Sequence, residues 1–310
     1  MRILVTGGAG FLGSHLCESL LQDGYDVVCL DNFYTGSTRN IKKLLDNRNF
    51  TVIQQDVTLP LSISVDGIFN LACPASPIHY QRDPIQTLKT SVYGAANLLE
   101  LATKTNVKIL QASTSEIYGD PLVNPQKESY FGNVNPIGPR ACYDEGKRAA
   151  ETLFQDYFLT QKTDIRIARI FNTYGPRMAL DDGRVVSNFI VQALLGHELT
   201  IFGTGEQIRS FCYVSDLIDG LKKLFFTDGV NAPVNLGNPE PISVHELALE
   251  IVELTKSNSR VVFQSLPIDD PKLREPNISF ARNILGWNPL IGRTEGLTTT
   301  IAHFRDLLTT

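Results

Sequence analysis

A tyrosine and a lysine four residues apart are the side chains in this sequence whose spacing most directly indicates chemistry. Tyr143 and Lys147 occur in the stretch YDEGK, which predicts the start of a helix running to about residue 161. Residues at i and i+4 share one face of a helix, so the ammonium would lie beside the phenol. That charge stabilises phenolate, as would a positively charged ring bound beside it, so we expect the tyrosine pKa to fall from about 10 toward neutrality and the phenol to act as a general base. A packed tyrosine beside a solvated lysine is the alternative.

A partner for this base is predicted at the end of an apolar run. Residues 108–112 predict a strand that leads into Ser113 and Thr114. The Thr114 hydroxyl can share a hydrogen bond with a substrate alcohol while Tyr143 removes its proton. The three side chains therefore predict oxidation of an alcohol, provided that a hydride acceptor binds beside them.

A nucleotide-binding turn is predicted by the first residues of the chain, MRILVTGGAGFLG. An apolar β-branched run predicts a strand, three glycines follow, and an amphipathic run over 11–21 predicts a helix. The first glycine permits a tight turn, the second lets the backbone approach a pyrophosphate, and the third lets the helix pack against the strand. The spacing is GxxGxxG rather than GxGxxG, and a glycine-rich turn without a ligand is the alternative. At the positive end of the helix dipole, the expected pyrophosphate contacts are Gly7, Gly10, Phe11, Leu12 and Gly13.

An acidic residue at the end of the next apolar run indicates which dinucleotide binds. Residues 26–30 predict a strand that ends at Asp31, about 20 residues beyond the glycines. A carboxylate there accepts hydrogen bonds from the adenosine ribose and repels a 2′-phosphate, so NAD is expected rather than NADP. A solvated aspartate at a strand end is the alternative. The other expected NAD contacts are Asn32, Tyr34, Thr35, Gly36, Asp56, Val57, Ala72, Tyr143 and Lys147.

Alternating apolar strands and amphipathic helices predict an α/β fold with a doubly wound parallel sheet of the Rossmann type. Ligands of such sheets bind at the carboxyl ends of the strands, where these candidates fall. The alternation fails after residue 170, which predicts a smaller C-terminal substrate-binding lobe. We expect an NAD-binding domain over 1–170, with 212–237 returning to it, and the lobe over 171–310. The expected strands are 3–5, 26–30, 50–55, 68–71, 108–112, 164–170 and 234–236, the expected helices are 11–21, 84–104, 143–161 and 215–226, and the expected loops include 72–80 and 120–140.

Composition excludes several classes of protein. The chain has 310 residues, of which 43% are hydrophobic, and a formal net charge of -5, which provides no basic patch for nucleic acid or an anionic membrane. Its five cysteines are scattered without CxxC spacing, which is typical of reduced thiols in a cytoplasmic protein. The first strand begins at residue 2 and no apolar run approaches the length of a membrane span, so we expect neither a signal peptide nor a membrane segment. No metal site is expected.

Long stretches carry more information than these single motifs. They are NLACPASPIHY (70–80), ASTSEIYGDP (112–121), NVNPIGPRACYDEGKR (133–148) and RIARIFNTYGPRMALDDGRVVSNFI (166–190). With the glycine turn and IFGTGEQIRSF (201–211) they cover nearly the whole chain, which resembles the extended short-chain dehydrogenase/reductase family. Within that family the long middle stretches are similar to the sugar-nucleotide enzymes that convert UDP-glucuronate into UDP-xylose.

The resemblance implies an enzyme that retains its NAD. Oxidation at C4 would make the C6 carboxylate part of a β-keto acid. Carbon dioxide would then leave while an enolate forms between C4 and C5. Reprotonation at C5 and return of the hydride to C4 would follow. The resemblance implies Tyr143 as base and later acid, Glu116 near C5 and C6, and Arg274 beside the carboxylate. A 4,6-dehydratase relative would carry an aspartate where this chain has Ser115, so dehydration is disfavoured.

Other expectations concern the nucleotide end of the substrate and the assembly. The guanidinium fork matches phosphate oxygens, so arginines are expected near UDP. A UDP-hexose 4-epimerase and a non-catalytic NAD-sensing domain remain alternatives. The family and apolar helix spacing favour a homodimer through 84–104 and 143–161. The UDP candidates are Asn172, Asn188, Arg177 and Arg209. Of the arginines, Arg177 and Arg184 are as readily expected to be solvated or paired with Asp181 and Asp182.

Overall fold

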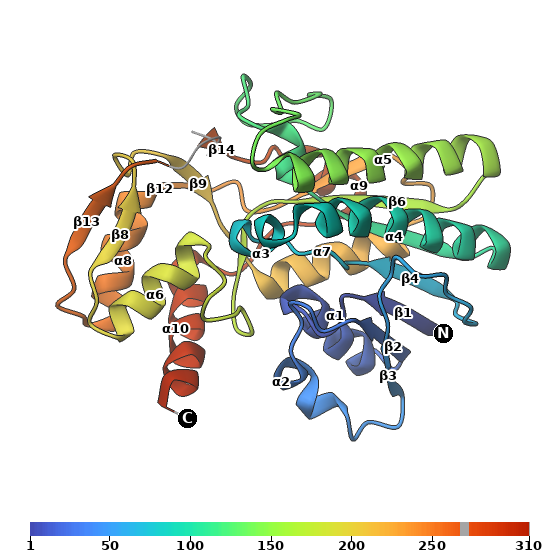
Figure 1. The fold of residues 1–310 in the computed structure, drawn as a ribbon, viewed down its shortest axis with the longest axis horizontal. Helices are drawn as coiled ribbons and strands as arrows, with labels where there is room; N and C mark the ends of the chain where they lie inside the picture. Colours follow the sequence, from blue (N-terminus) through green and yellow to red (C-terminus); the bar gives the residue numbers. More distant parts are fainter. Residues whose placement is uncertain (267–272, 310) are drawn as a thin grey trace.

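A parallel sheet of seven strands forms the centre of the larger lobe in this computed structural model, which describes residues 1–266 and 273–309 (Figure 1). Its strand order is β11-β6-β5-β4-β1-β2-β3. Each neighbouring pair is parallel, so the predicted doubly wound sheet is confirmed. The strands are β1 (Arg2–Thr6), β2 (Asp26–Asp31), β3 (Phe50–Gln54), β4 (Gly67–Asn70), β5 (Lys108–Thr114), β6 (Ile165–Ile170) and β11 (Pro233–Leu236).

Both faces of this sheet are buried, because alternate residues of a strand pack under different helices. In β1, Ile3 and Val5 belong to the core that contains α1 and α7, whereas Leu4 belongs to the core that contains α4 and α5. The strands therefore occur in the sequence as nearly continuous apolar runs. The covering helices are α1 (Phe11–Gln22), α4 (Pro84–Thr105), α5 (Ala141–Gln161) and α7 (Val214–Phe226).

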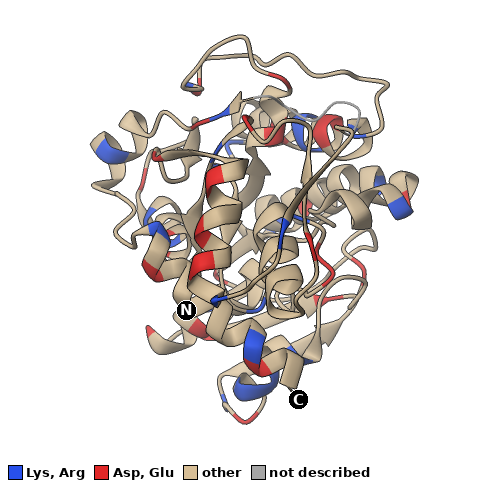
Figure 2. Cartoon of the chain, turned by 90° about the vertical axis from the view of Figure 1, so that its left-hand side faces the viewer, with Lys and Arg blue, Asp and Glu red and all other residues tan. Residues whose placement is uncertain are grey.

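A smaller lobe lies beside the carboxyl ends of the strands, on the left of Figure 1. Its core is formed by apolar side chains of three helices together with short strands. Figure 2 turns this side of the chain toward the viewer and marks the positions of Lys and Arg and of Asp and Glu along the ribbon. Its elements are α6 (Val185–Leu194), α8 (Val244–Thr255), α10 (Arg293–Thr309), the pair β8 (Leu199–Phe202) and β13 (Val261–Gln264), and the three strands β9 (Ile208–Ser210), β12 (Pro241–Ser243) and β14 (Leu273–Arg274).

Short elements occur where the sequence predicts loops or gives no clear pattern. The prediction of a loop over 72–80 is wrong for its second half, because α3 begins at Pro77. Proline is well suited to the first turn of a helix, where its missing N–H has no partner to lose. Within the described ranges, no helix has the length and apolar character needed to cross a membrane. The other short elements are α2 (Thr38–Ile41), η1 (Lys42–Leu44), α3 (Pro77–Arg82), η2 (Ser115–Tyr118), β7 (Thr173–Tyr174), β10 (Cys212–Tyr213) and α9 (Ser279–Leu285).

Candidate active site

A cleft of about 1220 Å³ opens at the carboxyl ends of the strands and extends beneath the smaller lobe. Every residue expected to contact NAD lines it except Gly36. The expected catalytic residues Thr114, Glu116, Tyr143 and Lys147 line it too, as does Asn172. The structure therefore brings these residues together from segments far apart in the sequence. Besides Gly36, three expected catalytic or substrate-binding residues do not line the cleft, and these are Asn188, Arg209 and Arg274.

The glycine turn between β1 and α1 fits a pyrophosphate. Gly7 has φ +67°, which favours glycine, and a Cβ at Gly13 would lie 2.0 Å from the Gly7 carbonyl oxygen. The residue before α1 is Gly10, which has no side chain to cap the helix, and the first turn contains no acidic residue. Backbone N–H groups at the positive end of the helix dipole are thus left for an anion.

We expect Gly13→Ala to lower the free energy of unfolding by about 2 kcal/mol or more, because the atoms that its methyl group meets are backbone and cannot move aside. NAD binding should weaken with it. Gly292→Ala is the matched control, since a Cβ there meets no atom of the described part of the chain within 4 Å. Chemical denaturation and NAD titration measure both effects, and equal stability of the two variants would contradict this account.

The Asp31 carboxylate organises the loop on which the adenosine half of NAD would rest. It accepts hydrogen bonds from the backbone N–H groups of Ala9 (2.9 Å) and Phe33 (2.8 Å). Burial raises the pKa of Asp31 and these two hydrogen bonds oppose that rise. Gly36 lies directly behind this carboxylate, where a Cβ would be 2.8 Å from either oxygen, so the structure gives it a packing role outside the cleft lining.

A second acidic residue lies next to Asp31 at the same edge of the sheet. Asp56 accepts hydrogen bonds from the Asn32 amide (2.9 Å) and from the backbone N–H (2.9 Å) and hydroxyl (2.7 Å) of Thr58. Although partial burial opposes the charge, these hydrogen bonds lower the pKa of Asp56. Asp56 therefore presents a charged carboxylate in the cleft.

Tyr143 and Lys147 lie on one face of α5, as their spacing predicts. The Lys147 ammonium is 5.7 Å from the centre of the Tyr143 ring and donates a hydrogen bond to the Ala112 carbonyl (2.8 Å). The Tyr143 ring stacks on Tyr80 with a centroid distance of 5.1 Å and an angle of 5°. This packing and the anchored lysine fix the phenol at the cleft.

The pKa of Tyr143 differs from the sequence-based expectation. Burial raises it above the usual range, whereas a hydrogen bond with the Thr114 hydroxyl lowers it. Burial also lowers the pKa of Lys147, whose charge was expected to stabilise phenolate. In the protein alone, desolvation is thus the largest influence on the pKa of Tyr143. The positive charge of an oxidised nicotinamide is the additional factor that would favour phenolate.

Glu116 lies between two arginines. Arg274 binds its carboxylate through both nitrogens (2.5 and 2.8 Å), and Arg140 binds it at 2.6 Å. Although burial opposes the charge, the two guanidinium groups hold the pKa of Glu116 at about 2. Arg274 reaches the site from β14, outside the cleft lining, and acts on the cleft through Glu116. Sequence reasoning assigned no role to Arg140, although it lies within one of the stretches that carry the resemblance.

A buried acid lies behind this cluster. Asp144 follows the tyrosine on α5, is 5% exposed, and one of its carboxyl oxygens has no hydrogen-bond partner among residues 1–266 and 273–309. Burial, together with the negative charge of Glu116, raises its pKa to about 8. Asp144 is thus an uncharged carboxylic acid near neutral pH.

A pH dependence of stability follows from Asp144. Its folded-state pKa exceeds the unfolded value of about 3.9, so its favourable contribution is complete at low pH and is lost as pH rises through about 8. We expect Asp144→Asn to lose less thermal stability than the wild type between about pH 5 and about pH 9, because the amide does not ionise. The melting temperature is measured as a function of pH, and the surface variant Asp26→Asn is the control. An equal fall in melting temperature for Asp144→Asn and the wild type would contradict this.

Asn188 and Arg209, two of the residues expected to contact UDP, do not line the cleft. The Asn188 amide donates to the Gly183 carbonyl (3.0 Å), and Arg209, which is 8% exposed, is in register with Arg274. Both lie behind the cleft surface. Arg184 pairs with Asp182, one of the alternatives considered, whereas Arg177 pairs with Glu18 instead of an aspartate.

The fold and the cleft together define a Rossmann-type enzyme with a tyrosine–lysine pair where its dinucleotide would meet a substrate. The chain belongs to the NAD dependent epimerase/dehydratase family, which matches residues 3–237. It is 54% identical to UDP-glucuronic acid decarboxylase 6 of Arabidopsis thaliana, over 98% of this chain and 89% of that protein. It is 53% identical to UDP-glucuronic acid decarboxylase 1 of Xenopus tropicalis, over 99% of this chain and 73% of that protein.

Solved structures share the whole fold. A UDP-glucuronic acid 4-epimerase from Bacillus cereus, in complex with UDP-glucuronic acid and NAD, superimposes with a TM-score of 0.88 at 28% identity. The match covers 99% of this chain and 100% of that one. This chain therefore shares its fold with an epimerase, and the fold alone does not determine which reaction its site performs.

Proposed function

We propose that this chain converts UDP-glucuronate into UDP-xylose and carbon dioxide, with NAD retained and restored in each cycle. The observation that carries the proposal is the Glu116 carboxylate, held by two arginines in the cleft that Tyr143 also lines. A substrate with a C4 hydroxyl and a C6 carboxylate needs both groups. The identity of 53 to 54% to decarboxylases, over nearly the whole chain, supports the same conclusion.

Tyr143 is placed to move the proton of the C4 hydroxyl. Thr114, which hydrogen-bonds to the phenol, orients the alcohol, and Lys147 adds a positive charge that is anchored to the Ala112 carbonyl. NAD held at the glycine turn and Asp31 would supply hydride transfer from C4 and back to it. Tyr143 therefore removes a proton at the start of the cycle and returns it to the C4 oxygen at the end.

Glu116 and its arginines are proposed to act at the other end of the sugar. Once C4 is a ketone, the C6 carboxylate is a β-keto acid, and its bond to C5 breaks as an enolate forms. A tight arginine–carboxylate pair would stabilise the substrate more than the transition state and would slow the loss of carbon dioxide. Glu116 already occupies both donors of Arg274 that face it. We propose that it thereby limits how tightly the substrate carboxylate can be held.

Mass spectrometry of nucleotide sugars tests this proposal. Purified protein is incubated with UDP-glucuronate without added NAD, and a UDP-pentose is expected. A UDP-hexuronate epimer, or conversion of UDP-glucose to UDP-galactose, would indicate an epimerase instead. No change in either sugar, with or without added NAD, would indicate a protein that only binds the dinucleotide.

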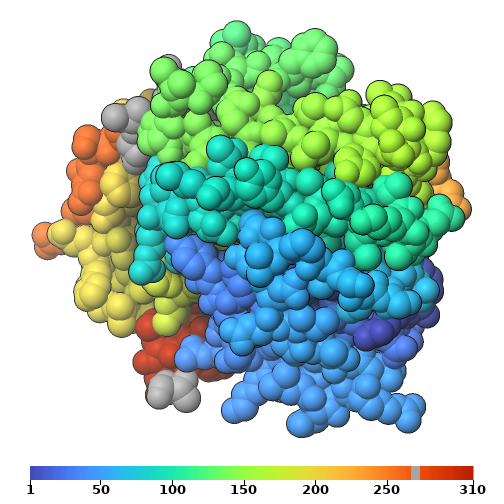
Figure 3. All heavy atoms as spheres, turned by 45° about the vertical axis from the view of Figure 1, so that its right-hand side comes forward, coloured from blue at the N-terminus to red at the C-terminus, as the bar shows by residue number. Residues whose placement is uncertain are grey.

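We propose that the chain forms a homodimer through α4 and α5, which lie side by side on the face shown in Figure 3. Exposed apolar side chains on these helices support this, among them Ile85 (68% exposed), Tyr93 (55%) and Leu159 (59%). We expect Ile85→Glu to be a monomer in sedimentation velocity and the control Leu290→Glu, exposed on another face, to remain a dimer. A monomeric wild type would overturn this proposal.

We also propose which ligand each lobe binds. Residues 1–170, with 212–237, would bind NAD, and the remainder of 171–310 would mainly bind the UDP-sugar. The pairing of β11 with β6 and the shared core of α1 and α7 support this.

We further propose a cytoplasmic location, which the five free thiols support because reducing compartments preserve them.

A further inference from the structure

Three polar residues lie in one row across the sheet, just before its strands end at the cleft. Ser113 on β5 is in register with Arg169 on β6, and Arg169 is in register with Asn235 on β11. Their exposed fractions are 3%, 9% and 0%. Polar groups buried this deeply require hydrogen-bond partners, so their contacts identify what the row holds.

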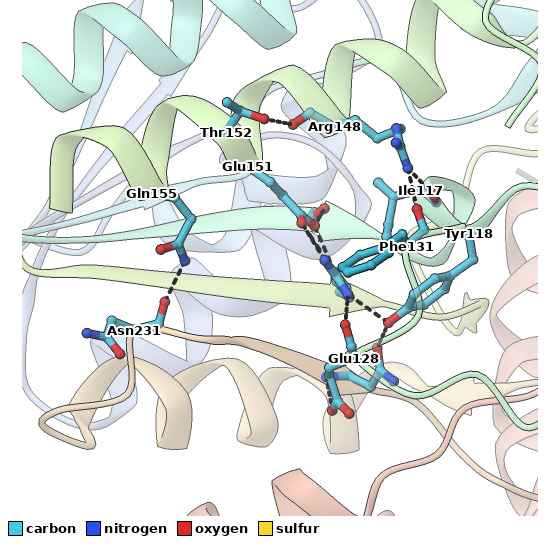
Figure 4. Close-up of polar contacts among 12 residues, drawn as sticks. Ile117, Tyr118, Glu128, Phe131, Arg148, Glu151, Thr152, Gln155 and Asn231 are labelled. Atoms are coloured by element: carbon cyan, nitrogen blue, oxygen red, sulfur yellow. Dashed lines mark hydrogen bonds and ion pairs between the residues drawn. The ribbon is translucent and has the colours of Figure 1, made fainter. Parts of the chain in front are cut away.

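The guanidinium of Arg169 joins three segments. It donates to the Glu151 carboxylate on α5 (2.7 Å), to the Tyr118 hydroxyl on η2 (3.0 Å) and to the backbone carbonyl of Glu128 (2.8 Å). Figure 4 shows the Glu151 carboxylate, the Tyr118 hydroxyl and the backbone of Glu128 meeting at one place from these segments. The Ser113 hydroxyl also donates to Glu151, so the buried charge pair is bound to the neighbouring strand.

The network continues through Asn235 to the segment that carries Arg274. The Tyr118 hydroxyl donates to the Asn235 side-chain oxygen (2.7 Å), and the Asn235 amide donates to the carbonyls of Gln126 (3.0 Å) and Asn277 (3.1 Å). The Gln126 side chain in turn accepts the backbone N–H of Glu275 (2.9 Å). The segment after β14 is thus attached to the same hydroxyl as Arg169.

Each attachment point is close in sequence to a residue of the site. Glu151 is one helical turn beyond Lys147 on α5, Tyr118 is two residues after Glu116, and Asn277 is three residues after Arg274. We infer that Arg169, Tyr118 and Asn235 are positioning residues that hold the tyrosine–lysine pair in register with the Glu116–Arg274 pair. This inference rests on the proposed function, because it assumes that both pairs act on one substrate.

The relative position of these two pairs of residues has a measurable consequence for the reaction. The proton of the C4 hydroxyl and the hydride of C4 leave beside Tyr143, whereas the bond between C5 and C6 breaks beside Glu116. One bound sugar must therefore be aligned with both pairs at once. If the two pairs shift relative to each other, the 4-keto pentose formed after loss of carbon dioxide is held less well and leaves before C4 is reduced again. The two electrons removed from C4 then remain on the cofactor, so each ketone released is matched by one NADH.

Tyr118→Phe tests the inference. It keeps the buried ring and removes only the hydroxyl that joins Arg169 to Asn235, whereas Arg169→Met would leave the Glu151 charge buried without a partner and endanger folding. We expect the ratio of released UDP-4-keto-pentose to UDP-xylose to rise about tenfold, with a matching amount of NADH, because one link of a buried network is lost. Mass spectrometry and cofactor absorbance measure the two products, and NAD titration measures cofactor affinity, which we expect to be unchanged.

Tyr174→Phe is the matched control. Tyr174 is equally buried, and its hydroxyl donates to the Arg293 carbonyl away from the cleft (3.0 Å), so its product ratio should equal that of the wild type. An unchanged ratio in Tyr118→Phe, with or without a slower rate or lower melting temperature, would show that the network only supports the fold. Failure of the wild type to produce any UDP-pentose would instead overturn the proposed function.

Discussion

Tyr143→Phe should reduce turnover of UDP-glucuronate by about 10³-fold, since it removes the group that transfers a proton at both ends of the cycle. The phenylalanine ring keeps the stacking on Tyr80, so the fold of the cleft should persist. NAD affinity should therefore change little. Steady-state kinetics and NAD titration distinguish loss of proton transfer from loss of cofactor.

The control for this variant lies on the same helix. Tyr157→Phe removes a phenol hydroxyl from α5 at a position that does not line the cleft, and its activity should equal that of the wild type. Near-normal turnover by Tyr143→Phe would contradict the assignment of Tyr143 as acid and base. Loss of NAD binding in that variant would show that the tyrosine holds the cofactor instead.

Glu116→Gln should lower kcat by about 10²-fold and also lower KM, an unusual combination. Without the negative charge, the donors of Arg140 and Arg274 become available to the substrate carboxylate. A tighter ground-state ion pair increases apparent affinity and slows the loss of carbon dioxide. Initial rates over a range of UDP-glucuronate concentrations separate the two parameters.

Glu100→Gln is the matched change at the surface, where the carboxylate pairs with Lys104 one turn along α4. It should leave both kinetic parameters unchanged. A Glu116→Gln enzyme with a raised KM and normal kcat would contradict the proposed role of Glu116, because it would mean that Glu116 contributes only to binding.

The sheet and the nucleotide-binding turn could be predicted from the sequence because their causes are local. Alternate residues of β1 enter different cores, so the strand had to be apolar along its length. The glycines between β1 and α1 reflect backbone conformation and close approach, which depend on residue type at fixed positions. Helix spacing likewise placed Tyr143 and Lys147 on one face.

The environment of the site could not be predicted in the same way, because it depends on contacts between distant segments. Arg140 reaches Glu116 only when the chain between them folds back, and the pKa of Tyr143 depends on how deeply α5 is buried. The position of Gly36 behind Asp31 depends on the path of a loop. Spacing along the sequence contains none of this information.

Isotope labelling tests most directly whether oxidation, decarboxylation and reduction occur at one site with a retained cofactor. UDP-glucuronate that carries deuterium at C4 is converted in ordinary water without added NAD, and the product is examined by mass spectrometry and NMR. We predict a UDP-pentose that keeps deuterium at C4 and gains one solvent hydrogen at C5, because hydride leaves and returns to the same carbon. A pentose without the C4 label, or a labelled UDP-hexuronate epimer in its place, would contradict the account.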